Sequence, residues 1–376
     1  MTPARSPALA AALATALASV LAGCAAGPAD TPSAAAPPVP ASTTPSAPPT
    51  GPSSAAPSSA APAPSGPTVV ASGLEVPWGL GFLPGGDALL TERDSARVLR
   101  LAAAGDEPRV VDTVDEAATR GEGGLLGLAV SPTWGVDGAY YVYATTRTDN
   151  RVLRLSTDEP DRAPEPVLTG IPKGVIHNGG RLAFGPDGML YVGTGDTGDT
   201  DLAQDQDSLG GKILRLDPRT KEVQVFSDGH RNVQGLAFDD AGRLWATEFG
   251  QDRFDEVNQV REGDDGGWPE VEGAGTGGGR YAEPAVVWDT DQASPSGAAV
   301  LGDDLYVAAL RGRRLWQVPL DGKGGTGEPV ALLQGDYGRL RSVQAAPDGS
   351  LWLTTSNRDG RGDPERDDDR VLRLVP

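Results

Sequence analysis

Short apolar segments separated by glycine-rich turns fill the chain from residue 68 to residue 376. Turns such as Pro-Asp-Gly at 186–188 and again at 347–349 interrupt the apolar segments. No stretch shows the spacing of a long amphipathic helix. Strand-length apolar segments bounded by Gly, Pro and Asp are typical of all-β proteins. The pattern therefore predicts an all-β fold.

One unit recurs six times: a turn with Asp or Gly, then a short strand that carries an aromatic or large apolar residue. The spacings between successive copies are 52, 50, 54, 61 and 46 residues. Units of this size are typical of propeller blades, which predicts a six-bladed β-propeller. A pair of β-sandwiches is the alternative, which the sixfold repeat disfavours. The anchor residues of the repeat are Leu89, Tyr141, Tyr191, Trp245, Tyr306 and Trp352.

A second strand pattern, a basic residue followed by Val-Leu-Arg-Leu or a close variant, occurs at 97–101, 151–155, 212–216 and 370–374. The last copy falls at the C-terminal end of the sequence. Because propellers often pair an N-terminal strand with the last blade, we expect ring closure at this copy.

The first 24 residues differ from the rest. Arg5 is their only charge, an apolar run follows it, and the segment ends in Leu-Ala-Gly-Cys, which resembles a bacterial lipobox. We predict a lipoprotein signal peptide, with lipidated Cys24 holding the exported protein at the outer face of the cell membrane. The alternatives are an ordinary signal peptide, with periplasmic or extracellular release, and a short transmembrane anchor.

Residues 25–67 are a predicted disordered linker, since 34 of the 43 are Ala, Pro or Ser. Residues 68–376 are then the folded propeller domain. Arg5 and Asp30 cancel, so the net charge of −20 belongs wholly to this domain. This charge disfavours nucleic acid as a partner and is compatible with bound cations. The single cysteine excludes an internal disulfide and a Cys-based metal site.

The two histidines of the chain, His177 and His230, limit the catalytic possibilities. His177 lies just before the glycine pair at 179–180, and Asp196 follows the next strand. A histidine with a carboxylate partner is a general base whose tautomer is fixed. The alternative is a loop histidine that caps a turn.

Two further polar segments are candidates for ligand binding. Donors at the start of a strand, Arg231, Asn232 and Gln234, suit an anionic or quinonoid ligand, with a surface turn as the alternative. A loop around Gly250 carries several carboxylates, which suit Ca²⁺ or are simply solvated. These carboxylates belong to Glu248, Asp252, Asp255 and Glu256.

Taken in order, these motifs resemble the soluble quinoprotein glucose/sorbosone dehydrogenases, which include the aldose sugar dehydrogenases. The resemblance covers most of 68–376 and includes the segments at 74–80, 121–127, 176–198, 229–232, 255–269, 308–313 and 338–341. It implies a six-bladed propeller that binds pyrroloquinoline quinone (PQQ) and Ca²⁺. It also implies oxidation of the C1 hydroxyl of an aldose sugar to the lactone, with electrons passed to an external acceptor.

The resemblance assigns catalytic roles to individual residues. His177 matches the base that takes the proton from the sugar C1 hydroxyl while hydride passes to the quinone C5 carbon. Asp196 matches the carboxylate that orients this histidine. Arg231 and Asn232 match the groups that polarise the quinone C5 carbonyl.

The resemblance also assigns binding roles. Arg339 and Arg341 match the arginine pair for the cofactor carboxylates, and Arg311 stands where the family often has a lysine. Gly250 and Gln251 match the two backbone carbonyls for Ca²⁺, although the family usually has Gly-Pro there. Near the substrate mouth, Glu122 and Asp201 replace glutamines of the best-known glucose enzymes. A Ca²⁺-dependent propeller lactonase and a cofactor-free binding propeller remain alternatives.

Overall fold

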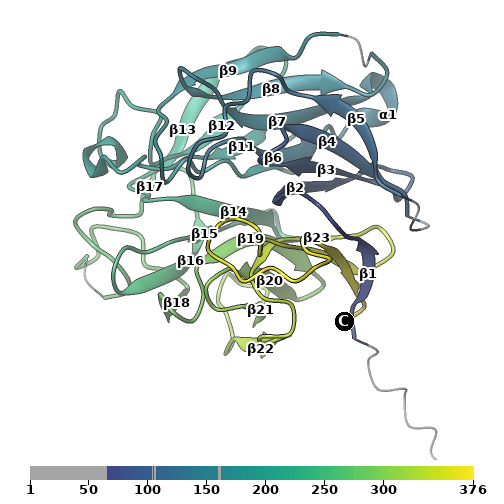
Figure 1. Ribbon diagram of the computed structural model, residues 1–376. Helices are drawn as coiled ribbons and strands as arrows, with labels where there is room; N and C mark the ends of the chain where they lie inside the picture. The colour runs from purple at the N-terminus through teal and green to yellow at the C-terminus, as the bar shows by residue number, and fades with distance from the viewer. Residues whose placement is uncertain (1–65, 104, 106, 160–161, 276) are drawn as a thin grey trace, which may run out of the picture. The chain divides into compact units, whose positions relative to one another are not determined.

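The computed structural model describes residues 66–103, 105, 107–159, 162–275 and 277–376 (Figure 1). The predicted signal peptide, Cys24 and all of the predicted linker except its last two residues lie outside the described residues. The described part forms six sheets and two short helical segments, α1 (Trp134–Asp137) and the 3-10 helix η1 (Thr200–Ala203). The prediction of an all-β, six-bladed propeller is therefore confirmed. No helix among these residues is long and apolar enough to cross a membrane.

The sheets follow one another along the chain, each as an up-and-down meander. The first two sheets contain β2 (Pro77–Phe82), β3 (Ala88–Glu92), β4 (Arg97–Leu101) and β5 (Arg109–Thr113), then β6 (Leu125–Val130), β7 (Ala139–Thr145), β8 (Asn150–Ser156) and β9 (Glu165–Ile171). The third contains β10 (Leu182–Phe184), β11 (Leu190–Gly193), β12 (Ile213–Leu216), β13 (Val223–Asp228) and, parallel to β13, the short β17 (Asp264–Asp265).

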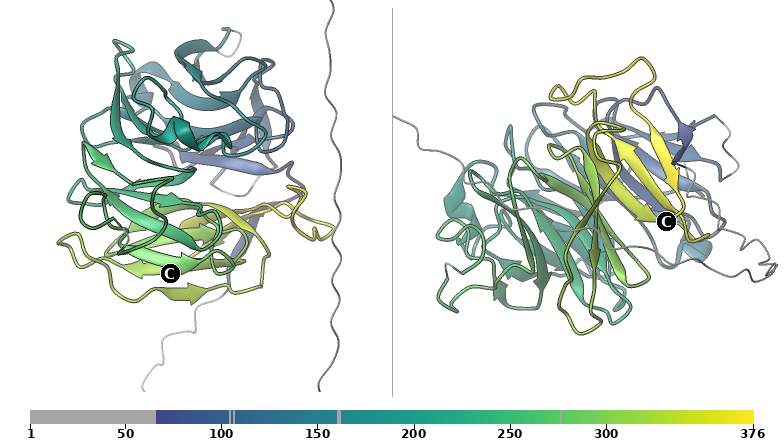
Figure 2. Two further views of the ribbon diagram at one scale, coloured as in Figure 1. Left: turned by 90° about the vertical axis from the view of Figure 1, so that its left-hand side faces the viewer. Right: turned by 90° about the horizontal axis from the view of Figure 1, so that it is seen from below.

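The fourth sheet contains β14 (Val233–Phe238), β15 (Leu244–Glu248), β16 (Phe254–Val260) and β18 (Val286–Asp289). The fifth contains β19 (Pro295–Leu301), β20 (Asp304–Ala309), β21 (Arg314–Pro319) and β22 (Val330–Leu332), and the sixth contains β23 (Leu340–Ala345), β24 (Leu351–Thr355), β25 (Val371–Leu374) and β1 (Thr68–Ala71). Figure 2 shows the teal, green and yellow sheets succeeding one another in chain order.

The first strand of each meander is the innermost strand of the ring. Contacts join β2 to β6, β6 to β10, β10 to β14, β14 to β19, β19 to β23, and finally β23 back to β2. β1 pairs antiparallel with β25, so residues from both ends of the described chain complete the last sheet (Figure 1). The expected ring closure at 370–374 is therefore present.

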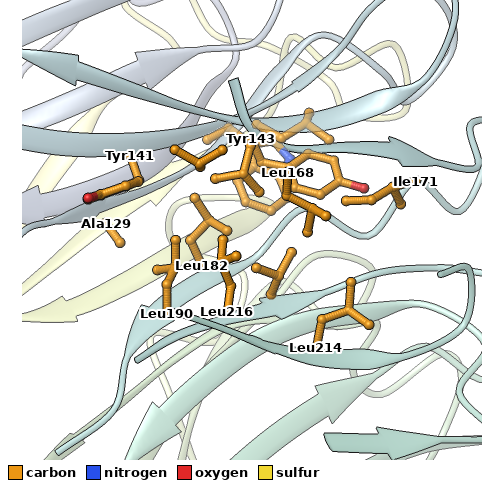
Figure 3. Packing of buried hydrophobic residues seen from close by; sticks show 14 residues of the cluster. Ala129, Tyr141, Tyr143, Leu168, Ile171, Leu182, Leu190, Leu214 and Leu216 are labelled. Carbon is orange, nitrogen blue, oxygen red and sulfur yellow. The ribbon is translucent and has the colours of Figure 1, made fainter. Parts of the chain in front are cut away.

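The sixfold repeat in the sequence marks the second strand of each sheet, and all six anchor residues are buried. Tyr141 and Tyr143 of β7 pack with Leu182, Leu190 and Leu216 of the next sheet (Figure 3). Full burial of a large side chain contributes roughly 1.5–3 kcal/mol. The repeat persists because each copy fills the space between two neighbouring blades.

Five of the six inner strands shift register near their starts, where a β-bulge leaves residues unpaired. In four of these strands a glycine follows the first unpaired residue. At one of these glycines, Gly127, a Cβ would lie 2.0 Å from the carbonyl oxygen of Gly180 in the neighbouring blade. Glycine thus allows neighbouring inner strands to approach closely. The bulge also changes the direction of the side chain at the first unpaired residue. These first unpaired residues are Trp78, Leu126, Gln234, Ser296 and Arg341.

Candidate functional site

Several of the predicted site residues lie at or just before the starts of inner strands. Glu122 precedes β6, His177 precedes β10, Asn232 precedes β14 and Arg339 precedes β23. These starts meet at one mouth of the central channel, which is the space enclosed by the six inner strands. A cavity of about 340 Å³ lies farther along the channel, lined by later residues of all six inner strands and by Arg181. None of the predicted site residues lines that cavity.

His177 and Asp196 form the pair that the sequence predicts. The distance from His177 Nδ1 to Asp196 Oδ1 is 2.6 Å, and the indole Nε1 of Trp268 donates to Asp196 Oδ2 at 3.0 Å. Burial works against the charge of Asp196, but the hydrogen bonds from His177, the Gly198 amide and Trp268 hold its pKa below the ordinary value. An ionised Asp196 accepts the Nδ1 proton and leaves Nε2 as a free proton acceptor.

The backbone of His177 is held as well as its ring. It has a φ of 51°, in the left-handed region that few non-glycine residues adopt. Its amide donates to Glu122 Oε2 at 2.9 Å, and Glu122 Oε1 pairs with Arg361 Nη2 at 2.7 Å. Burial opposes the charge of Glu122, but the His177 amide and Arg361 outweigh it and lower its pKa. Glu122, predicted as a substrate contact, thus also fixes the position of the histidine.

Arg231 and Asn232 lie beside this pair. The guanidinium of Arg231 lies 5.6 Å from the ring centre of Trp268, and its Nη1 donates to the Phe249 carbonyl oxygen at 3.2 Å. Asn232 Oδ1 accepts from the Gly179 amide at 3.1 Å. Arg231 Nε and Asn232 Nδ2 are buried and have no hydrogen-bond partner among the described residues.

Arg339 and Arg341 share one carboxylate. Arg339 Nη2 lies 2.9 Å from Asp359 Oδ2, and Arg341 Nη2 lies 3.8 Å from the same oxygen. Arg341 Nη1 donates to Gln234 Oε1 at 3.0 Å, whereas its Nε is buried without a partner in the described chain. Burial lowers the pKa of Arg341 to about 10, so the side chain stays charged at neutral pH. One carboxylate faces two buried cations here.

A further buried arginine adds to this positive charge. Arg181 lies 4.2 Å from the ring centre of Trp78, and its Nη2 lacks a partner among the described residues. Its Nε donates to the Gln234 carbonyl oxygen at 2.7 Å. Burial and the nearby Arg341 lower the pKa of Arg181 to about 9. Positive charge therefore extends from the arginine pair toward the cavity that Arg181 lines, an arrangement suited to an anion.

The predicted Ca²⁺ loop begins at Gly250. A Cβ there would lie 1.7 Å from the Phe254 carbonyl oxygen, so only glycine fits. The Gly250 amide donates to Asp255 Oδ1 at 3.0 Å, and burial raises the pKa of Asp255 to about 6. The described residues contain no group of three or more His, Cys, Asp or Glu side chains that could hold a metal ion. Of the carboxylates around Gly250, Asp252 is exposed, whereas Glu248 and Asp255 are buried.

Two predicted residues lie apart from this network. Asp201 is exposed in η1. Arg311 is exposed, and its Nη1 lies 3.5 Å from Thr290 Oγ1. In the described part of the chain no hydrogen bond or ion pair joins either one to His177 or to the arginine pair. The charge of Arg311 does act on Asp255 beneath the Ca²⁺ loop.

The sequence reasoning did not identify Trp268, Asp359, Arg361, Arg181 or Trp78 as parts of the site. One signal was available for Trp78. Its Trp-Gly-Leu sequence has counterparts in other inner strands, namely Leu-Gly-Leu at 126–128, Gln-Gly-Leu at 234–236 and Ser-Gly-Ala at 296–298. Each counterpart marks a bulge beside the channel.

The unpartnered donors test whether the predicted cofactor fits. Arg231 Nε, Asn232 Nδ2 and Arg341 Nε all belong to residues assigned to the quinone. A buried donor without a partner costs about 1–3 kcal/mol, so a ligand that supplies acceptors relieves several such costs at once. Carboxylates and quinone carbonyls are acceptors of this kind. The residues present therefore fit PQQ.

Known proteins support the same assignment. A solved structure of the PQQ-bound form of aldose sugar dehydrogenase from Streptomyces coelicolor matches with a TM-score of 0.78 and 51% identity, covering 82% of this chain and 96% of that one. Aldose sugar dehydrogenase YliI of Escherichia coli is 27% identical over 78% of this chain and 90% of its own length. Quinoprotein glucose dehydrogenase B of Acinetobacter calcoaceticus is 30% identical over 54% of this chain and 52% of its own length.

The match to a family profile covers residues 74–363, which span the ring from the residues before β2 to the loop that carries Asp359 and Arg361. It includes the His177 and Asp196 pair, the unpartnered donors and the arginine pair. The sequence motifs, the six-bladed fold and the geometry at the channel mouth agree with this match. The chain belongs to the Glucose / Sorbosone dehydrogenase family.

Proposed function

We propose that this protein is a PQQ-dependent dehydrogenase that oxidises the C1 hydroxyl of an aldose sugar to the lactone and passes the electrons to an external acceptor. The observation that carries the proposal is the proximity of a histidine–carboxylate pair to three buried donors that lack partners. The pair supplies a base, and the donors suit an acceptor-rich cofactor. The Streptomyces relative solved with PQQ bound supports the choice of cofactor.

His177 is the proposed general base. Its Nε2 accepts the proton of the sugar C1 hydroxyl, and the ionised Asp196 stabilises the imidazolium that results. Trp268 and the Gly198 amide keep Asp196 in place. PQQ, when bound, supplies a quinone carbon, C5, that accepts the hydride from the sugar.

Arg231 and Asn232 are the proposed donors to the C5 carbonyl oxygen, where negative charge develops. Arg339 and Arg341 would hold the cofactor carboxylates, with Arg311 at the edge of the site. An arginine fork suits paired carboxylate oxygens better than the point charge of a lysine does.

Ca²⁺ is the proposed metal, held by the backbone carbonyls of Gly250 and Gln251. A hard cation of this kind accepts neutral carbonyl oxygens together with oxygens of its ligand. Glu122 and Asp201 are the proposed contacts with the sugar at the mouth of the site. Glu122 lies nearer the reaction, because one of its carboxylate oxygens binds the His177 amide.

The location of the protein is also part of the proposal. Residues 1–24 would direct export, lipidated Cys24 would attach the protein to the outer face of the membrane, and residues 25–67 would act as a tether. Globomycin, which blocks the lipoprotein signal peptidase, should cause the unprocessed precursor to accumulate. Processing that continues unchanged in its presence would contradict the lipid anchor.

Reconstitution tests the activity directly. Purified apoprotein is mixed with micromolar PQQ and Ca²⁺, and the quinone absorbance is followed before and after an aldose is added. A spectral shift on binding, then sugar-dependent bleaching that an artificial electron acceptor reverses, is expected. Lactone hydrolysis without a quinone signal would identify the lactonase instead, and the absence of both activities would favour a binding propeller.

A further inference from the structure

One carboxylate oxygen holds four consecutive backbone amides of the Ca²⁺ loop. Glu272 Oε1 accepts from the amide of Gln251 at 2.7 Å and from the amides of Asp252, Arg253 and Phe254 at 3.1 Å each. The side chain of Glu272 is half-buried, whereas residues 251–253 are exposed. The loop is thus attached to the segment that follows Trp268 through this single oxygen.

Because peptide groups are planar, these hydrogen bonds also determine the direction in which the preceding carbonyls point. In a planar trans peptide, the C=O of one residue points opposite to the N–H of the next. The Gln251 amide, which points at Glu272, shares its peptide plane with the Gly250 carbonyl. The Asp252 amide, which also points at Glu272, shares its plane with the Gln251 carbonyl. Both carbonyls proposed as Ca²⁺ ligands are therefore turned away from Glu272.

The residue at position 251 makes this arrangement possible. A proline at this position would have a fixed φ but no N–H to donate. Gln251 lacks the stiff ring and supplies the amide that makes the shortest of the four bonds to Glu272. The loop is therefore restrained by hydrogen bonds, the shortest of which needs a residue other than proline at position 251.

We infer that Glu272 is a positioning residue for the metal: it orients the carbonyls of Gly250 and Gln251 toward Ca²⁺. The inference rests on the proposed function, since it assumes that this loop binds Ca²⁺. In this inference Glu272 is not a metal ligand. Its effect reaches the metal through two peptide planes.

The test compares Glu272→Ala and Glu272→Gln with the control variant Glu270→Ala. Glu270 is exposed, lies two residues earlier and contacts Arg280 and Tyr281, not the loop. The control therefore removes the same charge from the same segment and keeps the four hydrogen bonds from the loop amides to Glu272. Glu272→Gln keeps an acceptor oxygen and serves if the alanine variant folds poorly.

Two measurements separate the parts of the inference. Hydrogen exchange of amides 251–254 in the apoprotein needs neither metal nor cofactor, and should accelerate at least tenfold in Glu272→Ala. The Ca²⁺ concentration that half-saturates the PQQ absorbance change should rise about tenfold, with a smaller rise in Glu272→Gln and none in Glu270→Ala. At saturating Ca²⁺ the kcat should recover to within about twofold of the wild type.

The outcomes are distinguishable from a failure of the proposed function. Equal Ca²⁺ midpoints for the wild type and Glu272→Ala, or an equal rise in Glu270→Ala, would overturn the positioning role while the dehydrogenase proposal stands. If hydrogen exchange of amides 251–254 is the same in Glu272→Ala as in the wild type, Glu272 does not restrain the loop and the inference is wrong. A wild type that binds PQQ without any need for Ca²⁺ would overturn both the metal site and the inference.

Discussion

Glu122 Oε2 accepts a hydrogen bond from the backbone amide of His177 at 2.9 Å. A side chain from the segment before β6 thus holds the main chain of the segment before β10, in the next blade. The histidine has a φ of 51°, which an L-residue keeps only where its surroundings impose it. The ring of His177 is fixed by Asp196 and its backbone by Glu122. Two carboxylates thus position the proposed base, each through a different part of the residue.

Replacing Glu122 should therefore lower catalysis rather than only substrate affinity. Glu122→Ala removes the oxygen that accepts from the His177 amide, together with the ion pair with Arg361. We expect kcat to fall about tenfold, measured by dye reduction with saturating sugar. Arg361→Ala is the matched control, since it removes only the exposed partner, and it should cost about twofold. A rise in KM at unchanged kcat would show that Glu122 acts on the substrate alone.

His177→Ala should abolish turnover while cofactor binding persists. A positioned general base contributes about 10²- to 10⁴-fold, and the other histidine, His230, bonds to Ser227 and Glu248 instead. The quinone absorbance after reconstitution measures binding, and bleaching by sugar measures turnover. Unchanged bleaching by the reconstituted variant would eliminate His177 as the base.

Asp196→Asn should reduce kcat about 10³-fold or more with little change in the fold. The hydrogen bonds from His177, the Gly198 amide and Trp268 hold the pKa of Asp196 below its ordinary value despite burial, so the group is ionised at neutral pH. Asparagine is similar in shape but cannot stabilise an imidazolium, and it can turn the imidazole to the wrong tautomer. Circular dichroism and kcat together test this, and a variant within tenfold of wild type would contradict it.

Arg341→Gln should weaken PQQ binding by about 10²-fold. The variant removes a charge-assisted donor from a buried site and leaves Arg339 paired with Asp359. The PQQ concentration for half-maximal activity is the measurement. Arg373→Gln, which removes a partly exposed arginine paired with Asp348, controls for the loss of one positive charge and should not alter that concentration.

Asp359 should make stability sensitive to acid. Burial opposes its charge, but Arg339 and Arg341 hold its pKa below the ordinary value of 3.8. Because the folded-state pKa is lower than the unfolded one, this carboxylate contributes stability above pH 3.8, and the contribution is lost as pH falls through the folded-state pKa. Asp359→Asn should have a lower Tm at pH 7 and a shallower decline of Tm below pH 4. Parallel Tm curves for the two proteins would contradict this.

The sequence predicted those features that local pattern determines. The second-strand repeat identified all six blades, because inter-blade packing requires one large residue per copy, as Tyr141 and Trp245 illustrate. The same holds for the His177 and Asp196 pair, whose 2.6 Å contact joins the segment before β10 to the segment after β11, at the same end of this antiparallel strand pair. Local turn chemistry and strand length are sufficient for both.

Other contacts depend on the closed ring and could not be read from local pattern. Arg341 meets Gln234, which lies 107 residues earlier, and Arg181 meets Ser342, which lies 161 residues later. The bulges that bring such side chains together arise from strand pairing across a sheet, which a single segment does not reveal. Glu272 was missed for another reason: its partners are backbone amides 18–21 residues earlier, and a backbone amide leaves no mark in the sequence.

The pairing of β1 with β25 has a consequence for how the molecule forms. The two strands come from opposite ends of the described chain, so the last sheet cannot be completed until residue 374 is available. Contacts this distant in sequence form late and slowly, because loop closure must come first. An emerging chain would consequently remain an open arc while it is synthesised, and disruption of β1 should lower the barrier to unzipping the whole ring.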